Sequence, residues 1–289
     1  MEMRKNILFI VWMLPLFMAA QQASTDFAYV KQHLTDPGNE VVLVAAHRAM
    51  HTRYPENSLA AITDAIAHGV DIVEVDVRVS KDGIPVLMHN ETVDHISTGS
   101  GKVKKICLSE LKTFRLRDDR GKITRHSIPT LEEALNLGKD KIVFDIDLKV
   151  NTRDLKKVTA VVKKCDAINS VFFYDSEYDK IQRVERLLPG VLRMTKIHHD
   201  SKAKKHLEML LPDIVHLGNS AVDREVGFIE TVQRDYRLPV FANALGETDE
   251  AARDDIRAYD ILLDRKVNII QTDTPVLLLQ YLRQKNKHR

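Results

Sequence analysis

Cysteine is scarce in this chain of 289 residues, which contains only Cys107 and Cys165. Two thiols so far apart in a large domain do not make a disulfide framework, so we expect both to be unpaired core residues. A net charge of one sign is also nearly absent, since the formal charge is +2 at pH 7. This balance gives no electrostatic attraction for a polyanion, and it argues against a nucleic-acid partner.

Residues 1–20 hold a long apolar run. Arg4 and Lys5 precede the stretch from Ile7 to Ala20, which ends in small residues, and this order is typical of a secretory signal peptide. The run is shorter than the about 20 apolar residues of a membrane span, although an uncleaved anchor is the alternative. No cysteine near its end could accept a bacterial lipid anchor. We therefore expect an exported protein, periplasmic or secreted, with no stable membrane anchor after processing.

The rest of the chain, 24–289, is predicted to be one globular domain. Its composition, 44% hydrophobic and 29% charged, suits a soluble protein with a sizeable core. Short apolar runs alternate with amphipathic segments, the pattern of βα units around a parallel sheet. We expect strands at 41–46, 70–77, 141–148, 171–175, 191–197, 213–217, 239–243 and 268–272. We expect helices at 58–68, 130–137, 176–188, 200–211, 222–234, 248–265 and 274–285. Eight strands favour a closed (β/α)8 barrel over an open doubly wound sheet. The pattern predicts no oligomeric state.

One apolar run interrupts the alternation. Residues 84–89 follow the second strand too closely for a parallel crossover, so we expect them to return antiparallel through a two-residue turn at Asp82-Gly83. Residues 90–128 then read as an elaborated loop on the same rim. The charged tail 285–289 is expected to be a solvated end.

The second predicted strand carries two acids on one face. Because side chains alternate along a strand, Glu74 and Asp76 point the same way, opposite an unbroken row of valines. Inside a barrel, adjacent like charges are costly unless a cation or a proton lies between them. Both carboxylates can therefore hold one hard divalent ion. A solvated edge strand is the alternative, which the valines opposite disfavour.

Two histidines are expected near these acids. A two-residue hairpin turn would set His89 directly across from Asp76. His47 and Arg48 end the first strand, at the rim where barrel active sites gather. Two histidines, an arginine and two carboxylates on one rim indicate catalysis more than a structural role.

Other polar residues end further strands on this rim. The third strand adds Asp145, Asp147 and Lys149, of which either aspartate could reach the metal and only Lys149 a substrate anion. Asn243 and Asp273 end the last two strands, where they could bind substrate hydroxyls or cap helices. A divalent metal, two histidines and flanking cations suit displacement at a phosphodiester. One histidine would take a proton from the nucleophile and the other would protonate the leaving alkoxide.

Several motifs resemble one enzyme family. The motifs are His47-Arg48, PENS from Pro55, the run GVDIVEVDVRVSKDGIPVLMHNETVDHIS from Gly69, IPTLEEAL from Ile128 and IIQTDTP from Ile269. They lie in the order found in glycerophosphodiester phosphodiesterases, over residues 43–275. The resemblance implies a TIM-barrel phosphodiesterase that takes a small glycerophosphodiester as its substrate. Its products would be sn-glycerol 3-phosphate and an alcohol, formed through a cyclic phosphate.

The resemblance also implies residue roles. It makes His47 and His89 the catalytic acid/base pair, and it places the metal ligands, for Ca²⁺ or Mg²⁺, on Glu74, Asp76 and Asp147. The substrate-binding positions fall on Arg48, Lys149 and Glu56.

Three residues depart from the family pattern: Ala49 stands where glycine is usual, Asn90 where aspartate is usual, and Asp147 where glutamate is usual. These departures affect substrate identity more than catalysis. Two alternatives stay open: cleavage of lysophospholipids or other phosphodiesters at the same site, and a catalytically silent metal-binding or ligand-binding barrel.

Overall fold

The computed structural model of the chain describes residues 27–38, 40–197, 203–217 and 226–289, so the segment 1–20 lies outside it. Eight parallel strands form a closed barrel, as predicted, because β1 pairs with both β2 and β9. The barrel strands are β1 (Leu43–Ala46), β2 (Ile72–Val79), β4 (Val143–Leu148), β5 (Val171–Asp175), β6 (Leu192–Lys196), β7 (Ile214–Leu217), β8 (Val240–Asn243) and β9 (Ile269–Thr272). Within the described ranges, no helix has the length and apolar character needed to cross a membrane.

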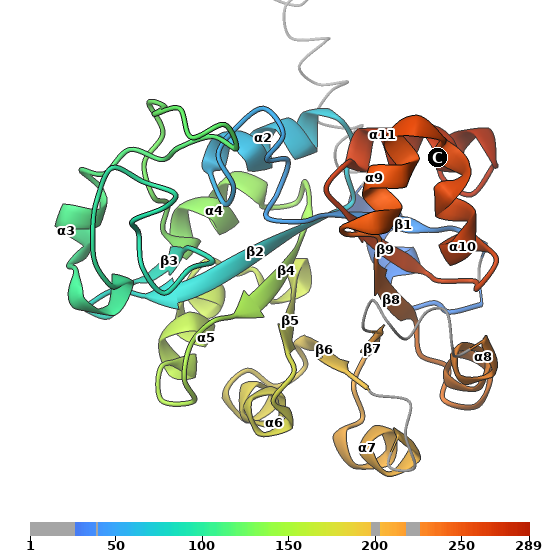
Figure 1. Ribbon diagram of the computed structural model, residues 1–289. Helices are drawn as coiled ribbons and strands as arrows, with labels where there is room; N and C mark the ends of the chain where they lie inside the picture. Colours follow the sequence, from blue (N-terminus) through green and yellow to red (C-terminus); the bar gives the residue numbers. More distant parts are fainter. Residues whose placement is uncertain (1–26, 39, 198–202, 218–225) are drawn as a thin grey trace, which may run out of the picture.

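Helices surround the barrel (Figure 1). The longer ones are α2 (Leu59–Ala67), α4 (Leu131–Gly138), α5 (Leu155–Lys164), α6 (Tyr178–Leu187), α7 (Ala203–Leu210), α8 (Val226–Asp235), α9 (Glu247–Asp254) and α11 (Pro275–Gln284). The structure contains α5, for which no helix is predicted from the sequence. The single helix expected over 248–265 is wrong, because α9, a 3-10 turn (Ile256–Tyr259) and α10 (Asp260–Leu263) replace it. The break falls at Asp255, whose backbone is extended and whose side chain accepts from the Arg257 N–H.

Local signals explain where helices begin and end. The Ser58 side chain accepts a hydrogen bond from the Ala61 N–H at the start of α2. Gly69 follows that helix with φ +72°, a conformation that glycine adopts without strain, so the predicted ends of α2 are confirmed. Thr130 and Glu133 form a reciprocal capping box at the start of α4.

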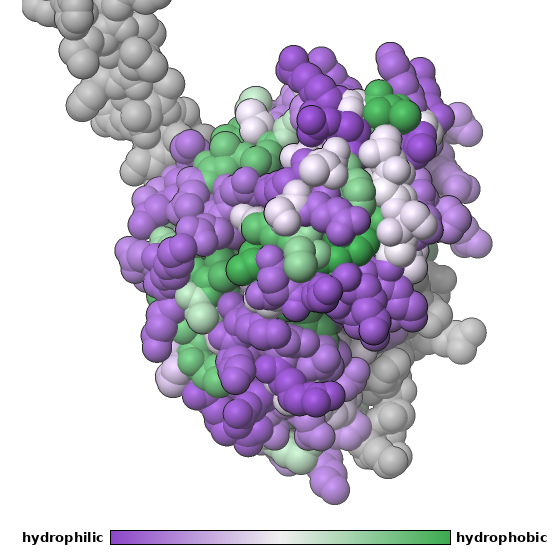
Figure 2. All heavy atoms as spheres, turned by 90° about the vertical axis from the view of Figure 1, so that its left-hand side faces the viewer, coloured by the Kyte–Doolittle hydropathy of each residue, from purple (hydrophilic) through white to green (hydrophobic). Residues whose placement is uncertain are grey.

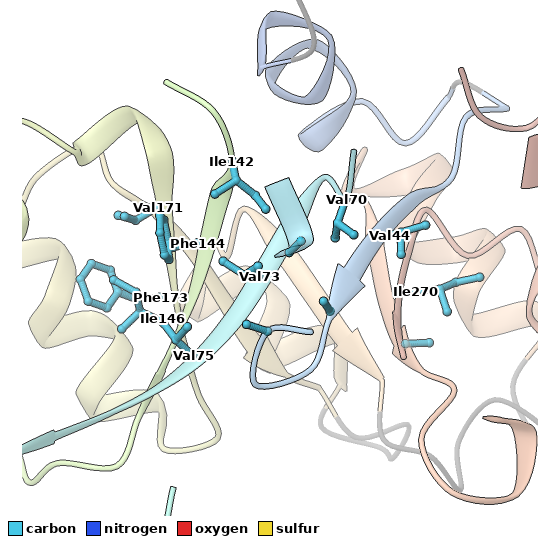
Figure 3. Close-up of a cluster of buried hydrophobic side chains, with 14 of the residues drawn as sticks. Val44, Val70, Val73, Val75, Ile142, Phe144, Ile146, Val171, Phe173 and Ile270 are labelled. Atoms are coloured by element: carbon cyan, nitrogen blue, oxygen red, sulfur yellow. The ribbon is translucent and has the colours of Figure 1, made fainter. Parts of the chain in front are cut away.

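The main core lies between the strands and the helices. Figure 3 shows the outward side chains of neighbouring strands, among them Val73, Val75, Phe144 and Ile270, packed into one apolar layer. These residues are fully buried. The outward row of valines on β2 therefore serves helix packing, and the inward row is left for the site.

A second apolar cluster fills the lower half of the barrel interior. It gathers Leu43, Ala45, Ile72, Val143, Phe172, Met194, Ile214, Phe241 and Ile269, and Val30 and Leu34 from the helix at 27–34 join it. Two residues further along the same inward face, every barrel strand turns polar. The bottom of the barrel is thus a packed plug, and the polar groups meet at its carboxyl-terminal rim.

The hairpin after β2 forms as predicted, but in another register. β3 (Pro85–Leu87) pairs antiparallel with β2, and Asp76 lies opposite Met88, so the predicted pairing of Asp76 with His89 is wrong. The Ser80 N–H donates to the Ile84 carbonyl, which leaves a three-residue loop ending in Gly83 at φ +87°. Such a loop adds one residue to the turn and shifts the register by one.

Residues 90–128 form an insertion with its own small core. Figure 1 shows it with α3 (Leu108–Leu111) beyond the end of β2, and Figure 2 shows this side of the molecule largely covered by hydrophilic side chains. The buried members of its core are Val86, Met88, Val93, Val103, Ile106, Leu111, Leu116 and Ile128. This separate packing fixes the segment that carries His89.

The C-terminal tail is packed, contrary to the predicted solvated end. His288 Nε2 lies 2.8 Å from Asp71 Oδ2, and Arg289 Nη1 lies 3.0 Å from Asp71 Oδ1. The Asp71 carboxylate is fully buried and also accepts from the Val44 N–H. One acid at the start of β2 therefore ties the tail to β1.

Replacing Asp71 by alanine is expected to lower the free energy of unfolding by about 2–3 kcal/mol, because His288 and the Val44 N–H lose a buried hydrogen-bond partner and Arg289 loses this ion pair. The urea midpoint of the variant measures this loss. Asp264→Ala, an exposed control, is expected to stay within about 0.5 kcal/mol of the wild type. Equal midpoints for the two variants would contradict the account of the tail.

Candidate active site

A cavity of about 980 Å³ opens at the carboxyl-terminal rim of the barrel. Six predicted site residues line it: His47, Glu74, Asp76, His89, Asp147 and Lys149. Arg48 and Glu56 lie beside it and do not line it. The rim therefore brings together residues that are up to about a hundred positions apart in the sequence.

Three carboxylates converge in this cavity. Oxygen atoms of Glu74, Asp76 and Asp147 lie within 4.8 Å of one another. β2 and β4 are in register, so that Asp76 neighbours Asp147 and Glu74 neighbours Asp145. Asp145 is deeper and nearly fully buried, and Asp147 is the aspartate that joins the cluster.

The electrostatics of the cluster fit a divalent cation. Burial raises the pKa of Glu74 well above its usual range, and the charges of Asp76, Asp147 and Asp145 raise it further. Burial also raises the pKa of Asp145 and of Asp147, with the neighbouring acids adding to the effect. Oxygen ligands with mutual repulsion are the donor set that Ca²⁺ or Mg²⁺ would satisfy.

The carboxylates are held by specific neighbours. The Asn57 side chain donates to Asp76 Oδ2 at 2.8 Å and accepts from the Asp76 N–H at 3.0 Å. Glu74 Oε2 accepts from the Arg48 N–H at 2.7 Å. These hydrogen bonds fix the orientation of the Asp76 and Glu74 carboxylates, which are two of the three candidate metal ligands.

Two cations flank the cluster. Lys149 Nζ lies 2.7 Å from Asp147 and 3.4 Å from Asp76. Arg48 Nη1 pairs with Glu56 Oε2 at 2.8 Å, and Arg48 Nε lies 3.7 Å from Asp76. Glu56 therefore positions Arg48, and of these two cations Lys149 is the one that lines the cavity.

His47 shares an acid with a second histidine. Asp273 Oδ1 lies 2.8 Å from His47 Nδ1 and 2.9 Å from His51 Nε2. Burial would raise the pKa of Asp273, but its bonds to the two imidazoles hold it well below its usual range. With Nδ1 occupied, Nε2 is the His47 nitrogen free to exchange a proton.

The same acid also acts on the pKa of His51. Burial would lower the pKa of His51, but the hydrogen bond and charge of Asp273, with Asp119 and Glu56, raise it above its usual value. His47, His51 and Asp273 could also hold a metal, and their two imidazoles would suit a transition metal such as Zn²⁺.

His89 has a neutral partner instead of an acid. His89 Nδ1 lies 2.8 Å from Asn90 Oδ1, which again leaves Nε2 free. Arg78 donates two hydrogen bonds to the His89 carbonyl, at 2.9 and 2.7 Å. The hairpin thus presents His89 to the cavity although its register differs from the predicted one.

No role is predicted from the sequence for Asn57, His51 or Arg78, and two roles are open for Asp273. Asp273 bonds to histidines, and Thr274 is the residue at the start of α11, followed by Pro275 in the first turn. The parity of β2 places Arg78 on the same face as Glu74 and Asp76, without predicting its bonds to the His89 carbonyl. The pairing of Asp273 with His47 joins residues 226 positions apart, which no local pattern reveals.

The loop after β1 adopts an unusual backbone. Arg48 and Ala49 have φ of +48° and +62°, so both lie in the left-handed region. This conformation turns the Arg48 N–H to the Glu74 side chain and the Ala49 N–H to the Glu74 carbonyl, 3.1 Å away. Ala49 thus keeps a conformation that glycine would adopt without strain.

Ala49→Val is expected to lower the free energy of unfolding by about 2–3 kcal/mol, because a β-branched side chain is strained at positive φ and overfills a buried position. Ala49→Gly is the matched control and should stay within about 1 kcal/mol of wild type. Chemical denaturation measures both. A stable valine variant would show that residue 49 does not need positive φ.

A family model matches most of the chain. The model of the Glycerophosphoryl diester phosphodiesterase family matches residues 47–276. A glycerophosphodiester phosphodiesterase from Caldanaerobacter subterraneus subsp. tengcongensis is 40% identical over 109 residues, which cover 37% of this chain and 45% of the relative. The chain thus matches less than half the length of that relative.

Solved structures share the fold. A glycerophosphoryl diester phosphodiesterase from Parabacteroides distasonis superposes with a TM-score of 0.79 at 21% identity, over 89% of this chain and 91% of that one. A phosphodiesterase from Oleispira antarctica, solved with the product sn-glycerol-3-phosphate, superposes with a TM-score of 0.70 at 22% identity, over 84% and 97%. At these identities the likeness shows the barrel alone.

Proposed function

The chain belongs to the glycerophosphoryl diester phosphodiesterase family, and we propose that it hydrolyses glycerophosphodiesters to sn-glycerol 3-phosphate and an alcohol with the help of a divalent cation. One observation carries the proposal. Three converging carboxylates line the same cavity as Lys149 and the two histidines His47 and His89. Phosphodiester displacement needs this combination of a cation site, a phosphate contact and two proton carriers.

Glu74, Asp76 and Asp147 are the residues that would hold the cation. When bound, a divalent cation offsets negative charge on the phosphoryl oxygens. Lys149 and Arg48 add positive charge beside it, and both are restrained by acids, Lys149 by Asp147 and Arg48 by Glu56. The phosphate would therefore meet a fixed set of charges that costs little reorganisation during the reaction.

The histidine partners suggest an order for the proton transfers. Asp273 stabilises the imidazolium that forms when His47 takes a proton, so His47 is the base for the glycerol 2-hydroxyl. His89, held by the neutral Asn90 side chain, gives its proton to the leaving alkoxide. The new bond joins the 2-oxygen to phosphorus, and the bond from phosphorus to the alcohol breaks.

The second half of the reaction reverses the roles. His89, now neutral, takes a proton from water as the water oxygen attacks the cyclic phosphate. The bond from phosphorus to the 2-oxygen breaks, and His47 returns its proton to that oxygen. Both histidines end in their starting states, and the product is glycerol 3-phosphate.

A product assay tests the activity. The purified protein, incubated with glycerophosphocholine, glycerophosphoethanolamine and glycerophosphoinositol, should release glycerol 3-phosphate with Ca²⁺ or Mg²⁺ and lose activity with a chelator. Release of a phosphorylated alcohol in place of glycerol 3-phosphate would contradict the assigned bond. Full activity in chelator would remove the cation from the mechanism, and no product from any ester would favour the silent barrel.

Export is a separate proposal, supported by the basic and apolar pattern of residues 1–20. Expression of the full chain in a bacterium should yield a mature protein that starts after the apolar run and lies outside the cytoplasm. An intact N-terminus on a cytoplasmic protein would contradict it.

A further inference from the structure

Five polar side chains form an arc on the cavity wall between the carboxylates and His47. The arc takes one residue from each of five strands that are neighbours in this order: Tyr174 from β5, Lys196 from β6, His216 from β7, Asn243 from β8 and Gln271 from β9. Each follows a buried apolar residue on the same inward face, two positions earlier. We call this set the β5–β9 arc.

The arc is polar but poorly paired within the protein. His216 Nδ1 and Asn243 Oδ1 are buried without a hydrogen bond of good geometry. Among the described residues, the side chains of Tyr174, Lys196 and Gln271 make no hydrogen bond or ion pair either. His216 and Gln271 are each only 6% exposed. Buried polar groups normally find partners, so this arc is built to pair with a ligand.

The carboxylate half of the cavity is better paired, although Asp145 Oδ1 is also buried there without a partner. There Asp76, Glu74 and Lys149 each have a hydrogen-bond partner from the protein. The contrast separates a preassembled half, which would hold cation and phosphate, from an open half with unused donors and acceptors.

The arc can both donate and accept. Burial lowers the pKa of His216 to about 4, which the Asn243 side chain offsets only in part, so the imidazole is neutral and keeps one acceptor nitrogen. Burial raises the pKa of Tyr174 well above its usual range, and the neighbouring acids raise it further, so its hydroxyl keeps its proton. Asn243 and Gln271 contribute amides, each with a donor and an acceptor. An alcohol hydroxyl can both donate and accept a hydrogen bond, so it can pair with this set of donors and acceptors.

We propose that the β5–β9 arc binds a polyhydroxylated leaving alcohol without positive charge, such as a cyclitol. The inference rests on the proposed function and narrows its substrate class. Glycerol is too small to account for the arc, because it offers two free hydroxyls. Neighbouring strands are about 4.8 Å apart, so the arc from β5 to β9 spans about 19 Å.

Charge disfavours the cationic alcohols. Lys196 has no ion-pair partner among the described residues and faces the cavity half-buried. Lys180, the other lysine on this side, pairs with Asp175 at 3.0 Å and Glu177 at 2.9 Å, so those acids are already engaged. A choline or ethanolamine group in the arc would meet the Lys196 charge directly.

The test compares kcat/KM for glycerophosphoinositol and glycerophosphocholine. The wild type should prefer the inositol ester by on the order of 10-fold. Tyr174→Phe and Asn243→Ala should each lower kcat/KM for the inositol ester by about 3- to 10-fold and change the choline ester by less than about 2-fold, because each removes hydrogen bonds to hydroxyls. Lys196→Met should shift the preference toward the choline ester.

Lys105→Met is the matched control, since Lys105 is exposed on the insertion, and its preference should equal that of the wild type. Equal losses on both esters in the arc variants would mean that the arc binds glycerol or supports the fold, and would overturn the inference. If the wild type released glycerol 3-phosphate equally well from both esters, this inference would be overturned and the proposed function would stand. Absence of glycerol 3-phosphate from every ester would overturn the proposed function and this inference with it.

Discussion

Replacing His89 by alanine is expected to lower kcat by about 10²- to 10⁴-fold, since general acid catalysis contributes that much. His89 lines the cavity with the carboxylates, and its Nδ1 is held by Asn90. Without its Nε2, the leaving alkoxide has no positioned proton donor. Steady-state kinetics with a glycerophosphodiester measures the loss, and KM should change far less than kcat, because the imidazole acts in the transition state.

His95→Ala is the matched control, because His95 is exposed in the insertion that follows His89. It should keep wild-type rates. His47→Ala should be as damaging as His89→Ala. Partial activity of His89→Ala on an ester with an acidic alcohol, such as nitrophenol, would support the assignment, because such an alkoxide leaves without a proton. Wild-type rates in His89→Ala would reassign the acid.

Replacing Glu74 by glutamine is expected to lower kcat/KM by about 10²-fold or more, because a cation at such a site supplies several kcal/mol of transition-state stabilisation. Glutamine keeps the size and an acceptor for the Arg48 N–H. The variant therefore removes charge and leaves the loop in place. Excess cation should restore part of the activity of the variant. If the variant needed the same cation concentration as the wild type, Glu74 would be excluded as a ligand.

The same substitution should stabilise the protein in chelator. Burial and neighbouring acids raise the folded-state pKa of Glu74, so above the unfolded pKa the folded state binds more protons than the unfolded one. Stability of the metal-free wild type should therefore fall as pH rises from the ordinary glutamate pKa toward the raised one. Glu74→Gln should show a weaker decline in urea midpoints over this range, and a parallel decline would contradict the account.

Strand periodicity was enough to predict the barrel and the inward acids. Eight apolar runs are sufficient to propose closure, and the alternation along β2 aims Glu74 and Asp76 inward. Parity alone could not choose between Asp145 and Asp147, because both point inward and only their depth along β4 differs. The choice of Asp147 rested on the family resemblance.

Other features depend on tertiary contacts. The hairpin register depends on one extra residue in the loop that ends at Gly83. The Asp-Gly pair predicts a turn but does not determine how many residues the turn contains. The charges of the tail predict a solvated end, because their partner Asp71 lies 217 residues before His288 and no local pattern links the two. The bond from Asp273 to His47 escaped prediction for the same reason.

A crystal of the protein soaked with Mn²⁺ and sn-glycerol 3-phosphate tests the central claim most directly. Anomalous scattering should place the ion among the carboxylates of Glu74, Asp76 and Asp147, with the phosphate on it between His47 and His89. An ion held instead by His47, His51 and Asp273, or a phosphate away from both proposed acid/base histidines, would contradict the account.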